Sequence, residues 1–253
     1  MSLITKRSFG QKADDNGNVF ERIGRSFERN FIREDRWKLI LQGLGTTCII
    51  TGASVVLGSV LALGVCLFRR TGSRLANAIS NAYVRLLQGT PIVVLLMILY
   101  YVVLGNTGLD AVWVAIIAFT LNYGAYGSEI MRTAIEAVPE GQREAALALG
   151  YSESQAFRDF IFPQAAVRFL PVLRGEIISL LKGTSVVGYI AIQDLTKMSD
   201  IIRSRTYEAF FPLITTALIY FALAWLLALV MRRILTYVDP RAKRKDGREV
   251  SAR

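Results

Sequence analysis

The residues of this chain that could do chemistry are a few polar and ionisable side chains inside long apolar stretches. They form two groups along the sequence: Asn122, Tyr126, Glu129, Arg132 and Thr133, then Glu176, Ser179 and Lys182. Asn122, Tyr126 and Glu129 recur at helical spacing, so we expect them to share one face of a helix. Ionised groups in apolar surroundings are costly unless they are paired or bind a ligand.

Two roles are open for these residues. They could line a path for a polar solute, or they could be structural ion pairs and anchors at the membrane interface. Glu129 lies three positions before Arg132, and residues at that spacing can neutralise each other on a helix. The sequence alone does not separate these roles for Glu129 or for Lys182.

The sequence argues against several other kinds of chemistry. It contains no histidine, which rules out histidine-based metal sites and general bases. The run Lys182-Gly183-Thr184-Ser185 has the residue types of a nucleotide-binding P-loop in the wrong order, because that loop needs Gly-Lys-Ser/Thr after an earlier glycine. We therefore expect no catalytic residue, no metal site and no ATP-hydrolysing motor of that kind in this chain.

Long apolar stretches indicate that the chain crosses a membrane. Hydrophobic residues make up 53% of its 253 positions and the mean hydropathy is +0.38, more than a soluble domain can bury. A membrane span needs about 20 residues, and spans can be drawn at 39–68, 80–104, 111–132, 169–192 and 210–234. We predict an all-α membrane protein with about five transmembrane helices. Pro91 lies inside the second span and should cause a kink or begin a helix there.

Charge predicts the orientation of these spans. The net charge of +10 could indicate nucleic-acid binding, but the basic residues flank the apolar stretches, as they do in membrane proteins with positive cytoplasmic loops. Arg69, Arg70 and Arg74 follow the first span, and we place them in the cytoplasm with the 139–165 loop and the basic tail, 238–253. Five spans then put the N-terminus outside, although its own Lys and Arg residues would favour the cytoplasm.

A charged extension, residues 1–38, precedes the membrane region, which we place at 39–237. Phe20, Ile23, Phe27 and Phe31 recur in this extension at helical spacing, with charged residues between them. Such a pattern is typical of an amphipathic helix that lies on the membrane surface.

A polar, helix-prone segment at 144–163 separates two of the spans. Glu144 begins a run of strong helix formers, and Gly150 can adopt the positive φ that ends a helix. Ser152 can cap a second helix, which we expect Pro163 to end. By itself this pattern suits either a docking site for a partner or an amphipathic connector on the bilayer.

The segment resembles the EAA loop of permease subunits in ATP-driven (ABC) importers, which is Glu-Ala-Ala, three residues, glycine, twelve residues and proline; here these are Glu144, Ala145, Ala146, Gly150 and Pro163. Further stretches, in the same order, are similar to permeases of polar amino-acid importers for histidine, arginine, glutamine and glutamate: Arg85–Pro91, Asn122–Arg132, Pro139–Gln142, Phe162–Ala165 and Ser179–Ser185. The chain departs from that family at Phe160 and Phe162, where aliphatic residues are commonest, and at Gly175, often asparagine.

The resemblance implies a type I ABC importer architecture in a bacterial inner membrane. It also implies a second permease subunit, identical or different, an extracytoplasmic solute-binding protein, and an ATPase subunit that carries ATP and Mg²⁺ and receives the EAA loop. Coupling is then expected at Glu144, Ala145, Ala146, Gly150 and Pro163, and an amino acid's ammonium and carboxylate could be held by the polar residues inside the spans. Alternatives are a permease for another small polar solute, an ATP-independent channel and a membrane scaffold.

Overall fold

The computed structural model describes residues 19–238, and all regular structure within that range is helical, as predicted. The long helices are α3 (Trp37–Arg69), α6 (Ala111–Glu136), α9 (Phe162–Gly183) and α11 (Phe210–Val238). The shorter ones are α2 (Val19–Phe27), α4 (Arg74–Gly89), α5 (Ile92–Met97), α7 (Glu140–Ala148), α8 (Glu153–Ala156) and α10 (Leu195–Thr206). Short π-helical turns lie at η1 (Glu28–Ile32), η3 (Ile98–Val103) and η4 (Phe157–Ile161), and 3₁₀ turns at η2 (Arg33–Asp35) and η5 (Thr184–Ile190).

Within that range, three helices are each long and apolar enough to cross a membrane: α3, α6 and α11. Two bent helix pairs raise the number of candidate spans to as many as five, in agreement with the predicted number. One pair joins α4 to α5–η3 through a bend of 106°, at the position where Pro91 was predicted to cause a kink or begin a helix. Thr90 is extended ahead of Pro91, and α5 starts immediately after the proline, because a residue before proline avoids helical backbone angles.

Close packing between α3 and α6 forms the centre of the fold. A Cβ atom on Gly58 of α3 would lie 2.6 Å from the Tyr123 ring, and one on Gly124 of α6 would lie 2.8 Å from Leu61. These glycines therefore let the two helices approach closely. A Cβ atom added to Gly52 or Gly64, also on α3, would meet no atom within 4 Å, so only part of the glycine content of this helix serves packing.

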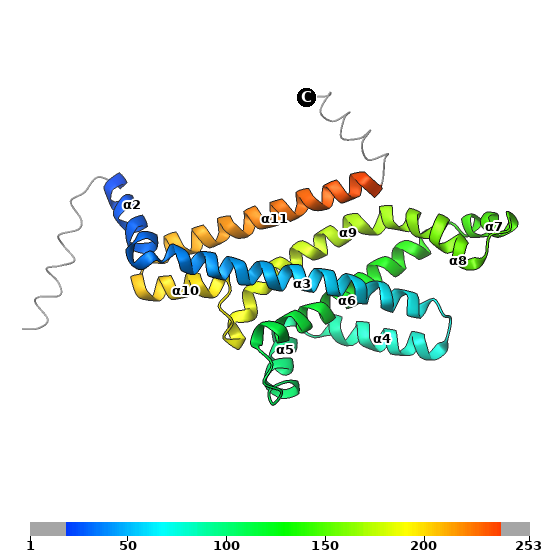
Figure 1. Cartoon of the computed structure of the whole chain (residues 1–253), viewed down its shortest axis with the longest axis horizontal. Helices are drawn as coiled ribbons and strands as arrows, with labels where there is room; N and C mark the ends of the chain where they lie inside the picture. Colours follow the sequence, from blue (N-terminus) through cyan, green and yellow to red (C-terminus); the bar gives the residue numbers. More distant parts are fainter. Residues whose placement is uncertain (1–18, 239–253) are drawn as a thin grey trace, which may run out of the picture.

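The helices place two ends of the molecule far apart (Figure 1). The segment 144–163, here called the EAA-like segment, begins in α7 and includes α8. These two short helices lie at one end, together with the end of α3 and the start of α4. The short helices α2 and α10 lie at the opposite end, beside the start of α3 and of α11. The α6–α9 pair connects the two ends, since α9 leaves the α7–α8 end and runs back along α6.

The N-terminal segment is helical over 19–32, but it is not an isolated surface helix. Phe31 is buried against Ile40, Leu195 and Ile202, and the Asn30 amide donates a hydrogen bond to the Glu208 carboxylate. Phe31 was predicted to face the membrane and instead packs inside the chain, because α10 and the start of α11 cover it. The remaining parts of the predicted terminal segments, 1–18 and 239–253, lie outside the described residues.

Candidate functional site

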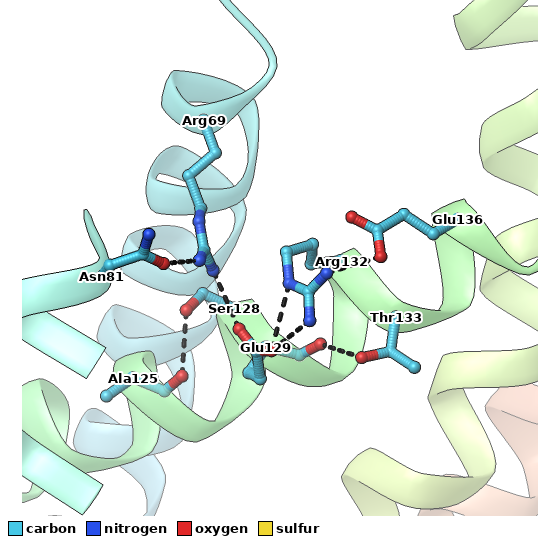
Figure 2. A network of polar contacts seen from close by, with 8 residues as sticks. All are labelled: Arg69, Asn81, Ala125, Ser128, Glu129, Arg132, Thr133 and Glu136. Carbon is cyan, nitrogen blue, oxygen red and sulfur yellow. Dashed lines mark hydrogen bonds and ion pairs between the residues drawn. The ribbon is translucent and has the colours of Figure 1, made fainter. Parts of the chain in front are cut away.

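A polar cluster joins α3, α4 and α6 at the α7–α8 end of the bundle (Figure 2). The Glu129 carboxylate on α6 accepts a hydrogen bond from Arg69 Nη1 at 2.8 Å and from Arg132 Nε at 3.1 Å. Arg69 also donates to Asn81 on α4, and Arg132 also pairs with Glu136. Glu129 thus holds two guanidinium groups, one from its own helix and one from the last turn of α3.

The structure pairs Glu129 with Arg132, as their spacing allowed, and adds Arg69, which the sequence had placed simply in a cytoplasmic loop. Arg69 is more covered than Glu129, with 13% of its side chain exposed against 32%. A pair at this depth keeps more of its attraction than one in water. No local pattern could have predicted Arg69, since it lies 60 positions from Glu129.

The cluster borders a cavity of about 450 Å³ at the same end of the molecule. Its lining is largely cationic and amide: Arg69, Arg70, Arg132, Asn77 and Asn81, with Glu136, Cys66 and Ile135. On the other side of α6, Glu129 and Thr133 face a second, more apolar cavity of about 330 Å³ that Arg168 and Val172 of α9 also line. Glu129 therefore lines the second cavity, while its partners Arg69 and Arg132 line the first.

The other polar residues predicted to line a solute path do not all lie near Glu129. Asn122 and Tyr126 are half-buried on the same face of α6 as Glu129, and the Asn122 amide donates to the Leu87 carbonyl at 3.4 Å. Glu176 is half-buried on α9, whereas Ser179 and Lys182 are exposed further along that helix. None of these three α9 residues lines either cavity.

The EAA-like segment folds as a helix, a glycine turn and a second helix. Gly150 has φ +87° and follows the end of α7. Its N–H donates to the Leu147 carbonyl at 2.9 Å, and the Tyr151 N–H donates to the Ala146 carbonyl at 3.2 Å. This is the Schellman arrangement that satisfies the last carbonyls of a helix. The predicted helix end at Gly150 is confirmed.

The second helix begins as predicted but does not end at Pro163. Ser152 caps α8 in a capping box, with its hydroxyl accepting from the Gln155 N–H and the Gln155 side chain accepting from the Ser152 N–H. The chain then continues through the π turn η4 into α9, with Pro163 in the first turn of α9. Proline is tolerated there, because the first N–H groups of a helix have no partner within it. The predicted break at Pro163 was therefore wrong.

An ion pair links the two helices of this segment. Arg143 on α7 donates to Glu153 at the start of α8 with Nε–Oε2 at 3.0 Å, and to Glu140 with Nη1–Oε1 at 2.6 Å. Hydrogen bonds from the Arg143 guanidinium hold the pKa of the Glu153 carboxyl below its usual range, so the pair stays ionised at neutral pH. The sequence interpretation missed this link, which crosses the glycine turn.

The segment presents only some of the predicted coupling residues outward. Glu144, Ala145, Gly150 and Pro163 are exposed, whereas Ala146 is 2% exposed and packs against the chain itself. Leu149 is 75% exposed at the end of α7, and it was not among the predicted contacts. Leu149 is therefore an apolar side chain that the rest of this chain leaves uncovered.

A family model and two curated relatives match most of this chain. Residues 41–244 match the family described as "Binding-protein-dependent transport system inner membrane component". The arginine transport system permease protein ArtQ of Bacillus subtilis (strain 168) is 34% identical over 197 residues, which cover 77% of this chain and 90% of that protein. The L-cystine transport system permease protein TcyB of the same organism is 33% identical over 219 residues, covering 86% and 94%.

Solved structures agree on the fold. A crystal structure of an amino acid ABC transporter with histidines has a chain that is 34% identical, with a TM-score of 0.70 over 81% of this chain and 94% of that chain. The inward-facing MetNI methionine ABC transporter, at 22% identity and a TM-score of 0.70 over 81% and 99%, shares the fold. The chain therefore belongs to this family: it is a multi-pass inner-membrane protein, the non-catalytic permease subunit of an ABC importer.

Proposed function

We propose that this permease imports polar amino acids and is driven by an ATPase subunit that docks on the exposed face of α7. The observation that carries the docking proposal is the outward face of the EAA-like segment, where Glu144, Ala145 and Leu149 are exposed around a glycine-capped helix end. The names of the relatives, which specify arginine and cystine transport, support an amino-acid substrate.

The partners follow from the same assignment. ATP and Mg²⁺ belong to the ATPase, and no cofactor is needed on this chain. A second permease subunit, identical or different, completes the path; most of α11 and part of the Glu129 face of α6 remain uncovered within one chain. An extracytoplasmic solute-binding protein delivers the solute. The α7–α8 end and the C-terminus then face the cytoplasm, and the N-terminus faces outside.

Within the membrane, the half-buried face of Asn122, Tyr126 and Glu129 is the best-supported part of the path. Carboxylate and amide groups there suit the ammonium and carboxylate of an amino acid. Glu176, Ser179 and Lys182 form a second set of path residues, on α9. They contact the solute when the second permease subunit or another conformation of the transporter places the solute beside α9.

Charge reversal on α7 should separate this chain from its ATPase. Glu144→Arg places a cation where a carboxylate faces outward, and Gly150→Asp puts a side chain at φ +87°, where only glycine is unstrained. Both variants are expected to lose co-purification of the ATPase from membranes. Glu21→Arg, the same reversal on an exposed residue of α2, should leave it intact. Retained ATPase in both the Glu144→Arg and the Gly150→Asp variants contradicts docking at α7.

Uptake by proteoliposomes tests the transport function itself. The permease, its ATPase and its solute-binding protein are expected to accumulate radiolabelled L-arginine, L-glutamine or L-cystine only when ATP is present. Uptake without nucleotide would identify a channel, and the absence of uptake for all solutes would indicate a scaffold. Uptake of another small solute, with none of the amino acids, would contradict the substrate class alone.

A further inference from the structure

The last turn of α3 carries two adjacent arginines that contact different parts of the molecule. Arg69 reaches into the polar cluster and binds Glu129 and Asn81. Arg70 points toward the EAA-like segment, where its guanidinium carbon lies 3.6 Å from the centroid of the Phe157 ring. A guanidinium over an aromatic face at this distance is a cation–π contact.

Phe157 belongs to the segment on which the ATPase is proposed to act. It is the first residue of the π turn η4 that connects α8 to α9. Its ring packs on Phe162 at 5.8 Å between centroids, and Phe162 packs on Phe169 of α9 at 5.8 Å. Phe162 thus joins a row of aromatic rings that ties the segment to α9. A displacement of α8 must move the Phe157 ring and with it the surface on which Arg70 rests.

The two arginines are mechanically linked, because α3 remains helical up to them. The Arg70 N–H donates to the carbonyls of Cys66 and Leu67 at 3.3 and 3.1 Å. The backbone at Arg69 and Arg70 therefore moves as one piece, with Cα atoms about 3.8 Å apart. The 450 Å³ cavity beside both side chains leaves room for this end of α3 to shift.

We propose that Arg70 is a positioning residue that passes movement of the EAA-like segment, through α3, to the Arg69–Glu129 pair. When Phe157 moves, the Arg70 guanidinium moves with it. The end of α3 then shifts, and the hydrogen bond from Arg69 to the Glu129 carboxylate changes. Glu129 lines the more apolar cavity and its partner Arg69 lines the larger one, so ATPase closure changes the charge pairing at the cytoplasmic end of the path. This role rests on the proposed ATPase docking at α7.

Import per ATP hydrolysed tests the proposal in the reconstituted complex of permease, ATPase and solute-binding protein. Arg70→Ala and Phe157→Leu should each lower the amount of labelled amino acid imported per ATP about two- to fivefold, the range that an exposed cation–π contact supplies. ATPase binding should be unchanged in both. Phe157→Trp keeps an aromatic face and should keep the wild-type ratio. Arg74→Ala, which removes an exposed arginine at the start of α4, is the matched control.

A double variant distinguishes a shared contact from two separate defects. Arg70→Ala combined with Phe157→Leu should be no worse than either alone, because both remove the same interaction. Additive losses, or a wild-type ratio in Arg70→Ala, would overturn the proposal.

Cys66 provides a second readout that does not depend on the solute. It is 2% exposed and lines the cavity beside the arginines. In a Cys48→Ser background, the rate of its modification by N-ethylmaleimide should differ between the nucleotide-free and ATP-bound complexes, and Arg70→Ala should remove the difference. An unchanged nucleotide effect in Arg70→Ala argues against the link. If the wild-type permease fails to bind the ATPase at all, the proposed docking itself is wrong, which is a separate result.

Discussion

Replacing Gly43 with alanine is expected to destabilise the permease strongly. A Cβ atom at this position would lie 2.7 Å from the carbonyl oxygen of Asp194 and 2.8 Å from the Cα of Leu195. These are backbone atoms of the N-cap and the first residue of α10, and both residues are fully buried, so neither can move aside. Overpacking of this kind costs about 1–3 kcal/mol.

Several hydrogen bonds depend on the close approach of α3 to the start of α10. The Leu195 N–H donates to Thr47 Oγ1 at 3.2 Å, and the Asp194 carboxylate caps α10 by accepting from the N–H groups of Thr196 and Lys197, each at 3.0 Å. Separating α3 from α10 would weaken the first of these bonds and displace the cap. The loss of stability should therefore reach the upper part of the range.

Thermal unfolding in detergent measures this effect. Gly43→Ala should lower the midpoint by about 2–4 °C for each kcal/mol lost. Gly52→Ala is the matched control on the same helix, because no atom lies within 4 Å of its Cβ position; it should be neutral or slightly stabilising, since alanine favours helix. Equal midpoints for the two variants would refute the close contact between α3 and α10.

Removing the charge of Glu129 is expected to abolish most transport while the protein still assembles. Glu129→Gln leaves Arg69 and Arg132 without the carboxylate that holds both. Hydrogen bonds to charged groups contribute about 1.5–3 kcal/mol each, and the partial exposure of Glu129 places the loss toward the lower end of that range. If the conformation that binds the solute loses this much free energy of stabilisation, its population falls, and uptake falls about tenfold or more.

Two further variants make this result specific. Glu136→Gln removes the other acidic partner of Arg132, but that side chain is 62% exposed and should matter little. Adding Arg69→Gln to Glu129→Gln removes one of the uncompensated cations and should restore part of the lost stability. Uptake is measured in proteoliposomes, and ATPase co-purification reports assembly. Wild-type uptake by Glu129→Gln would show that the cluster is only structural.

Local patterns in the sequence predicted features that depend on a few neighbouring residues. The helix start after Pro91, the helix end at Gly150 and the Ser152 cap all follow from backbone angles and side-chain hydrogen bonds within about four residues. Pro163 was misread by the same local reasoning. Proline breaks a helix when it lies in the helix interior, but it is tolerated in the first turn. The π turn η4 places Pro163 in the first turn of α9, and that depends on how the chain folds around it.

Other features needed the folded chain. Ala146 has the size expected for a close contact with a partner, yet it lies on the inner side of α7. Phe31 shares its helical face with residues that suit a membrane surface, but α10 and α11 cover it. In both cases the sequence correctly indicated that the side chain packs against something. It did not indicate that the packing partner is this chain itself, because burial depends on elements distant in sequence.

The sequence by itself determined that this chain is a helical membrane protein, which segments are apolar and long enough to cross a membrane, and which polar segment resembles the EAA loop. Apolar length, charge next to the spans and turn chemistry are local properties, so they can be read along the chain. Only the tertiary structure decided that Arg69 holds Glu129, that Arg70 rests on Phe157, and that Gly43 admits the α10 turn. These contacts join residues 60 or more positions apart, and their geometry is set by how the helices pack together.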